Sequence, residues 1–315
     1  MKRAWRLIEQ VLSVVGFAWL CWFIYDSRDT IFEGVATTSA FDLAALIGLI
    51  LVSWFAMGLQ NVVLLKSQNV NLGAGESLLV HASSSLLNYV PTRLGTMFRF
   101  RYLLQVHGLS YDRNLGLIAL RFGLLLAISA VMATIGIVGL GLVDGVKDAA
   151  LTLGLFAVAG IVVLLFLWRV APSQGEGLLW RLWNGFVAAI HEGRQRKDRL
   201  AILAVLIVVQ LALGAIRMDI AFDIVGTPVD LPLLLVVSPV VVVLGLFSFA
   251  SLGVREAIIG GLVAATGHNF AAGVIAASAE RAALLLLCLT LGVVGTAVMS
   301  LRMRAVARAE DESAS

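Results

Sequence analysis

The stretch Ser248-Phe-Ala-Ser-Leu-Gly-Val-Arg-Glu-Ala257 places two adjacent charged residues, Arg255 and Glu256, inside an apolar run from Leu231 to Ala265. Charged side chains are costly in hydrocarbon, so they persist there only where they face protein or water. Gly253 precedes the two charges and is typical of a point where one helix ends and another begins. The sequence therefore predicts a broken helix at this stretch.

The whole chain is strongly apolar. Of its 315 residues, 60% are hydrophobic and only 14% are charged, and long stretches such as Phe122 to Leu142 carry no charge. A soluble domain has too little interior for this composition, so the sequence predicts an all-α polytopic membrane protein. The net charge of +3 is small and reflects Lys and Arg in loops. It therefore gives no support for binding to nucleic acid.

The sequence contains no pattern typical of a catalytic or metal site. Cys21 and Cys288 both lie in apolar spans, and the four histidines are scattered without a His-x-x-x-His pair. We find no nucleophile–base pair and no nucleotide-binding loop with workable spacing. We therefore expect no catalytic residue, no metal and no cofactor, and we expect that the protein is not an enzyme.

Hydropathy predicts six full membrane spans, at about residues 7–25, 43–65, 115–142, 149–167, 200–224 and 270–299. Lys and Arg gather in the loops on one side, and the positive-inside rule makes that side cytoplasmic. We expect the protein to lie in a bacterial cell (inner) membrane. Both termini would be cytoplasmic, and residues 304–315 would form a short polar tail. Helical spacing of apolar residues from Leu179 to Ile190 predicts an amphipathic helix at the membrane interface.

Two further apolar segments are interrupted before they can cross. Pro91 ends a helix that begins near Glu76, which leaves fewer than the ~20 residues that a crossing needs. We predict that residues 76–104 and 231–266 form two re-entrant helical hairpins that enter from opposite sides. A helix lying flat on the inner leaflet is the alternative for the first segment. The small polar run Ser83-Ser84-Ser85 favours packing inside a helical bundle instead.

The order of span, span, hairpin and span occurs twice, with opposite orientation, and this predicts an inverted repeat. The two repeat halves cover about residues 5–145 and 146–303 of a single transmembrane domain, 1–303. A short internal echo supports this prediction. Arg93-Leu-Gly-Thr-Met-Phe-Arg99 and Ser251-Leu-Gly-Val-Arg255 both contain Leu-Gly followed by Arg.

Arginines near the two breaks predict a binding site for an anion. Broken helices direct backbone N–H groups to a shared point, and arginine binds phosphate in a bidentate geometry. We expect a lipid phosphate headgroup to bind between the two hairpins. The candidate substrate-binding residues come from both hairpins and the flanking spans: Arg93, Gly95, Arg99, Arg121, Gly253, Arg255, Glu256, Glu280 and Arg281.

Structural roles remain open for several of these residues. Arg99 is equally compatible with a position at the membrane interface, and Arg121 with a side chain that extends to the interface. Salt bridges between Arg255 and Glu280, or between Glu256 and Arg281, would account for the deeper charges without a ligand.

These residues also resemble the motifs of a known family. Pro91-x-Arg-Leu-Gly95 followed by Arg99 looks like the first signature of the lysylphosphatidylglycerol synthase transmembrane-region family, also called flippase-like. Leu252-Gly-Val-Arg-Glu-Ala257 is similar to the second signature of that family. Long members of the family add a soluble domain that transfers an aminoacyl group from tRNA to phosphatidylglycerol. We expect that domain to be absent here, so the resemblance implies lipid binding or translocation without the synthase chemistry.

The sequence therefore favours a flippase-like lipid transporter whose partners are membrane lipids with an anionic headgroup, either phospholipids or polyprenyl phosphates. One alternative is a non-transporting membrane subunit that presents a lipid carrier to a separate transferase. Another is an ion-coupled transporter of a soluble anion, in which Asp219 or Asp223 would take part in the coupling.

Overall fold

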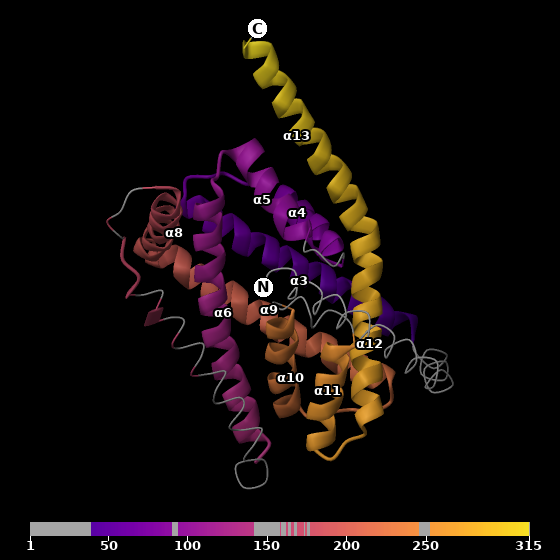
Figure 1. The fold of residues 1–315 in the computed structure, drawn as a ribbon. Helices are drawn as coiled ribbons and strands as arrows, with labels where there is room; N and C mark the ends of the chain where they lie inside the picture. The colour runs from indigo at the N-terminus through magenta and orange to yellow at the C-terminus, as the bar shows by residue number, and fades with distance from the viewer. Residues whose placement is uncertain are drawn as a thin grey trace, which may run out of the picture. The chain divides into compact units, whose positions relative to one another are not determined.

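The structure, a computed structural model, describes residues 39–89, 94–141, 177–245 and 253–314, together with positions 158, 162, 165, 166, 169–172 and 174. These residues are helical with short connections, and no strand occurs among them (Figure 1). The predicted span at 7–25, most of the predicted span at 149–167, and Arg93 lie outside the described residues. The prediction of an all-α fold is confirmed for the part that is described.

Four of the described helical runs are long and apolar enough to cross a membrane: α3 (Ala40–Ser67), α6 (Tyr111–Gly139), α9 (Lys197–Ile224) and the continuous run Phe270–Ala309. The last run consists of α12 (Phe270–Leu287), the π-helical turn η2 (Cys288–Gly292) and the first part of α13 (Val293–Ala314). They match four of the predicted spans and make this a multi-pass membrane protein. The total of six spans stays a prediction.

Large apolar side chains face outward on these long helices. Val131 and Ile135 on α6 are 60% and 57% exposed, and Val205 on α9 is 62% exposed. Exposing these side chains to water would cost roughly 25 cal/mol for each Å² of apolar surface. Contact with lipid chains removes this cost, so the outward faces of these helices suit a bilayer.

The chain forms two compact units, each assembled from separate segments. The first, here called the α10–α12 unit, comprises residues 1–53, 129–155 and 211–286. The second, the α4–α5 unit, comprises residues 54–128, 156–210 and 287–315. Each unit therefore contains residues from both predicted repeat halves, and the inverted repeat stays a prediction.

In the α4–α5 unit, two short helices, α4 (Ala74–Asn88) and α5 (Leu94–His107), lie side by side (Figure 1). At 1.5 Å per residue each is about 22 Å long, short of the ~30 Å hydrocarbon core. The side-chain Oδ1 of Asn88 accepts a hydrogen bond from the backbone N–H of Thr96 at 3.2 Å and ties the two helices together. The predicted break after α4 is confirmed.

Small residues allow α4 to pack closely against η2 and α13. A Cβ added at Gly292 would lie 2.7 Å from Leu86 Cβ, and one at Gly295 would lie 2.6 Å from Ser83 Oγ. The serine run on α4 therefore faces another helix, as its composition predicts. This packing favours the hairpin over a helix that lies flat on a membrane surface. Its re-entrant course stays a prediction.

In the α10–α12 unit, α10 (Leu231–Leu244) and α11 (Val254–Ala265) form the second pair of short helices. Asp230 occupies the N-cap position of α10, followed by proline in the first turn, but its side chain makes no capping hydrogen bond. Gly253 begins α11 with a φ of 81°, a conformation that favours glycine. The second predicted break is therefore also present.

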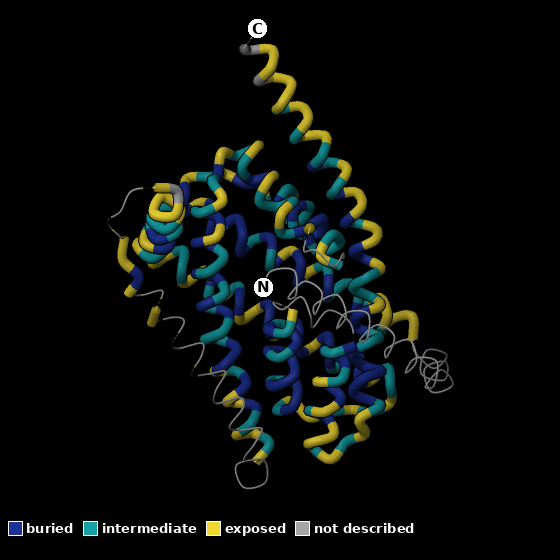
Figure 2. Tube along the Cα trace, in the orientation of Figure 1, coloured by how far each residue is buried: buried dark blue, intermediate teal, exposed yellow. Residues whose placement is uncertain are grey.

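The α10–α12 unit has an apolar core, and the buried parts of its helices are dark blue in Figure 2. Phe222 from α9, Val237 from α10 and Ile259 from α11 are fully buried in it. Helices α11 and α12 approach closely where Gly260 meets Gly273, since a Cβ at Gly273 would lie 2.8 Å from the Gly260 Cα. Gly260 therefore allows the two helices to pack closely.

The predicted amphipathic helix is present as α8 (Leu178–Gln195) in the α4–α5 unit. Val187 and Ile190 are buried on one face, whereas Leu179 is 79% exposed. The buried face contacts α6, where a Cβ at Gly116 would lie 2.5 Å from the Phe186 carbonyl oxygen. The exposed apolar residues suit the predicted position at a membrane interface.

Candidate functional site

Two complementary ion pairs join α11 to α12 in the α10–α12 unit. Arg255 Nη2 lies 2.5 Å from Glu280 Oε2, and Arg281 Nη1 lies 2.5 Å from Glu256 Oε1. Adjacent residues of opposite charge on α11 thus face adjacent residues of opposite charge on α12. Both salt bridges that the sequence leaves open as alternatives are present. All four side chains are buried, so neither partner can be removed without leaving a charge in an apolar interior.

Glu256 has a second contact that explains the start of α11. Its Oε2 accepts a hydrogen bond from the backbone N–H of Gly253 at 2.8 Å, while its Oε1 receives Arg281. A carboxylate in the first turn of a helix also interacts favourably with the helix dipole. Glu256 therefore holds the broken end of α11 and anchors it to α12.

Arg217 on α9 adds a third cation to this group. Its Nη2 lies 3.4 Å from Glu280 Oε1, so one carboxylate serves both Arg217 and Arg255. The network contains three arginines and two glutamates and keeps a single excess positive charge. Arg217 was not among the predicted site residues, although a charge inside an apolar span is a signal for a buried partner.

The α4–α5 unit contains a second group of arginines, Arg99 and Arg121, whose neighbours differ from those of the first group. Arg99 on α5 is half-buried and donates from Nη2 to Asn61 Oδ1 on α3 at 3.1 Å. Arg121 on α6 is 7% exposed and close enough to Arg99 for the two charges to repel each other. The Nε atoms of both arginines and the Nδ2 of Asn61 are buried without a hydrogen-bond partner. Two predicted site residues, Arg99 and Arg121, are thus neighbours, and together with Asn61 they carry three unsatisfied donors.

His81 on α4 belongs to the same group. Its ring makes an edge-on contact with Trp54, with centroids 5.5 Å apart. Helix α4 is outside the four candidate spans, and burial, followed by the charges of Arg121 and Arg99, lowers the pKa of His81 to about 3. The imidazole is therefore neutral at physiological pH. The positive charge of the group resides on the two arginines.

Carboxylates are absent from the interior of this group in the described helices. Helix α5 contains no acidic residue, α4 contains only Glu76, and the acidic residue of α6 is Asp112 in its first turn. Glu76 Oε1 accepts a hydrogen bond from the hydroxyl of Tyr102. The same oxygen lies 3.0 Å from His107 Nε2 and 3.0 Å from Arg302 Nη1. Its charge is therefore committed to α5 and α13. Arg99 and Arg121 differ in this respect from the arginines of the α10–α12 unit.

Gly95 and Arg93 were also predicted as binding residues. A Cβ added at Gly95 would overlap the Ser84 carbonyl oxygen and approach Asn88 Oδ1, so Gly95 allows α4 and α5 to pack. Its structural role is evident, whereas Arg93 lies outside the described residues. His81 and Asn61 were not among the predicted site residues, and their signal in the sequence was a polar residue within an apolar segment.

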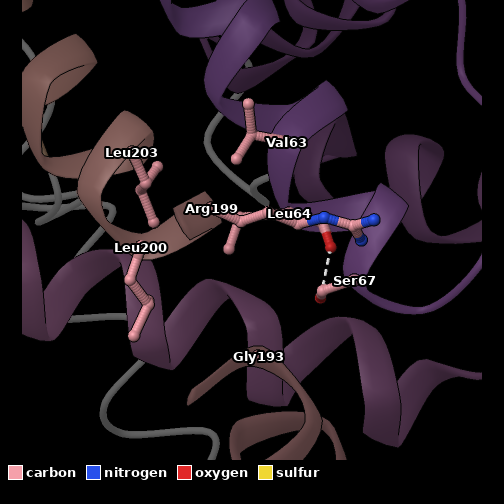
Figure 3. Close-up of a pocket in the computed structure, with 7 residues that line it drawn as sticks. All are labelled: Val63, Leu64, Ser67, Gly193, Arg199, Leu200 and Leu203. Atoms are coloured by element: carbon pink, nitrogen blue, oxygen red, sulfur yellow. Dashed lines mark hydrogen bonds between the residues drawn. The ribbon is translucent and has the colours of Figure 1, made fainter. Parts of the chain in front are cut away.

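A small cavity occurs elsewhere in the α4–α5 unit (Figure 3). Its volume is about 10 Å³, far below the roughly 300–1,000 Å³ of typical ligand pockets. Ser67 at its edge donates its hydroxyl to the Leu64 carbonyl at 2.6 Å. None of the predicted site residues lines it; the lining consists of Val63, Leu64, Ser67, Gly193, Arg199, Leu200 and Leu203. In the described ranges no cluster of three or more His, Cys, Asp or Glu could hold a metal ion.

Comparison with known proteins places the chain in a family. The model of the family described as lysylphosphatidylglycerol synthase TM region matches residues 10–292. The match covers both pairs of short helices, both arginine groups and most of the predicted spans. Comparisons with curated proteins and with solved structures gave no significant match.

Proposed function

Because the chain belongs to the lysylphosphatidylglycerol synthase transmembrane-region family, we propose that it is a flippase-like lipid transporter that binds an anionic lipid headgroup. The observation that supports this proposal is the pair of arginines, Arg99 and Arg121, which no carboxylate of the described residues contacts. In the proposal their guanidinium groups hold the headgroup phosphate.

The energetic argument starts from the cost of the two charges. A buried cation without a counter-ion is strongly unfavourable, and two that repel each other are more so. An arrangement of this kind is expected where a ligand supplies the missing negative charge. Arginine is suited to the role, since Nε–H and one Nη–H can contact two phosphate oxygens together. The Nε–H groups of Arg99 and Arg121 have no hydrogen-bond partner in the protein, so each can supply one donor of such a pair.

The arginines of the α10–α12 unit have a different place in the proposal. Arg255 and Arg281 already contact Glu280 and Glu256, so carboxylates of the protein already balance their charges. We therefore assign the network first to holding α11 against α12. Glu256 and Glu280 then have the charge-balancing role that the sequence predicts.

Reconstitution in vesicles tests the proposal. The protein would be inserted into liposomes that contain a fluorescent anionic phospholipid, and transbilayer movement would be followed by chemical quenching of the outer leaflet. We expect movement with the natural chain and loss of it with Arg121→Ala. Arg101→Ala is the matched control, because Arg101 is an exposed arginine on α5.

The outcomes separate the alternatives. Movement that is equal in Arg121→Ala and in the natural chain would overturn the proposed role of Arg121. Arg121-dependent binding of the lipid without any movement would replace the transporter by a subunit that presents a lipid to a separate transferase. Uptake of a soluble anion that requires Asp219 or Asp223 would favour the ion-coupled alternative. Asp219 is half-buried and Asp223 is exposed on α9.

A further inference from the structure

We infer that the site at Arg99 and Arg121 selects a terminal phosphate, a monoester or diphosphate of charge about −2, over a phosphodiester of charge −1. This inference rests on the proposed function and names the chemical class of its ligand. A terminal phosphate monoester or a diphosphate occurs on some lipids, and it also occurs on soluble metabolites.

Charge matching is the first argument. Two cations face the site, and the neighbouring histidine is neutral. Glu76, the carboxylate of α4, is engaged by Tyr102, His107 and Arg302. A phosphodiester would neutralise one of the two arginines and leave the other buried with its charge. A dianion neutralises both, which matters most where the surroundings are apolar.

The hydrogen-bonding capacity of the site is the second argument. The three unsatisfied atoms at this position, Arg99 Nε, Arg121 Nε and Asn61 Nδ2, are all donors. Two bidentate arginines and one amide offer at least five N–H groups to the ligand. A terminal phosphate presents three unesterified oxygens, whereas a diester presents two. The larger number of acceptors fits the larger number of donors.

The α10–α12 unit serves as an internal contrast. Its three arginines share two glutamates, so only a single positive charge remains there. Each arginine of that network contacts a carboxylate of the protein itself. The excess of two charges is therefore a property of the Arg99 and Arg121 group and not of every buried arginine in this chain.

A binding experiment with two lipids of identical chains tests the inference. Dioctanoyl phosphatidic acid carries a phosphate monoester, and dioctanoyl phosphatidylglycerol carries a diester. Titration calorimetry of the full chain in detergent would compare their dissociation constants near pH 8. We expect the monoester to bind roughly tenfold to a hundredfold more tightly, the range for one charge-assisted interaction. We expect this preference to shrink near pH 5, because the monoester takes up a proton at about pH 6.

Substitution makes the test sharper. In Arg121→Gln the site retains one arginine, so the preference for the monoester should fall to about one or reverse. Arg101→Gln removes the same charge from an exposed position on α5 and should leave the preference unchanged. Far-ultraviolet circular dichroism and gel filtration of each variant would establish that it is folded.

The outcomes distinguish this inference from the proposed function. Equal, Arg121-dependent binding of both lipids would overturn the selection for a dianion and leave an anionic headgroup site. Binding of neither lipid in an Arg121-dependent manner would overturn both. Glycerol 3-phosphate provides the soluble source of the same chemistry. If glycerol 3-phosphate competes with an affinity equal to that of the short-chain lipid, the preference for a dianion holds and the ligand is a soluble phosphate. If it competes only weakly, the ligand is a lipid.

Discussion

Arg255 on α11 and Glu280 on α12 form a buried ion pair, with Nη2 and Oε2 2.5 Å apart. The same carboxylate lies 3.4 Å from Arg217 on α9, so Glu280 connects three helices. The pair gives the Arg-Glu step after Gly253 a direct structural purpose. It fixes the second short helix of the α10–α12 unit against its neighbour.

The two partners of this pair should differ in their importance for stability. Glu280→Ala removes the carboxylate that both Arg255 and Arg217 contact, and we expect it to lower the free energy of unfolding by about 3–5 kcal/mol. Arg255→Ala should cost less, because Arg217 still contacts Glu280. Chemical unfolding of the purified protein in detergent would measure both. The double variant should be less unstable than the sum of the two, and simple additivity would contradict a direct coupling.

Gly253 should resist substitution for a backbone reason. Its φ of 81° lies in the left-handed region, where a side chain costs about 1–2 kcal/mol. We therefore expect Gly253→Ala to lower stability by about this amount and to weaken the contact between the Gly253 N–H and Glu256. Gly261→Ala on α11 is the control, because a Cβ there meets open space. It should be neutral or slightly stabilising, and an equal loss in both variants would argue against strain at Gly253.

Much of the helical architecture was accessible from the sequence. Long, mostly apolar runs predict α3, α6, α9 and α12, because a crossing helix needs about 20 apolar residues. The two breaks could also be located. Pro91 cannot continue a helix, and the charges at Arg255 and Glu256 cannot lie in the middle of a lipid-facing span. The π-helical turn η2 had no such signal, since its residues are ordinary for an apolar helix.

The candidate site was harder to predict, for a physical reason. An arginine that pairs with glutamate and an arginine that awaits an anion are identical in sequence. Arg255 and Arg121 were both candidates, and only the distances show that the first contacts a carboxylate. The convergence of Asn61 and His81 with Arg99 and Arg121 depends on packing between helices. Polar residues in apolar segments indicate burial but do not identify their neighbours.

Glu76 should make stability depend on pH. Burial alone would raise its pKa, but hydrogen bonds from Tyr102 and His107, with the charges of His107 and Arg302, lower it below the ordinary value of 4.5. A depressed pKa contributes stability that is present above about pH 4.5 and is lost as the pH falls through the folded-state value. Glu76→Gln should therefore be less stable than the natural chain at neutral pH, with a difference that disappears in acid.

Thermal unfolding in detergent between about pH 7 and pH 3.5 would measure this difference. Tyr102 stays a donor throughout, since burial and its hydrogen bond to Glu76 raise its pKa to about 12. Glu192→Gln is a suitable control, because that carboxylate is partly exposed and lies 3.5 Å from Arg113. A gap between Glu76→Gln and the natural chain that persists unchanged in acid would show that the charge of Glu76 is not what stabilises the cluster.

Arg121 should show the opposite effects on stability and on binding. A buried cation that no described carboxylate contacts destabilises the ligand-free protein, so Arg121→Gln should raise its free energy of unfolding by about 1–3 kcal/mol. The same change should remove binding of the anionic ligand, because it deletes one of two phosphate contacts. Arg281→Gln is the matched contrast, since it removes a buried arginine that already contacts Glu256. It should lower stability, because Glu256 is then left without its cation. Unfolding measured without added lipid would compare the two variants, and a loss of stability in both would mean that Arg121, too, has a partner within the protein.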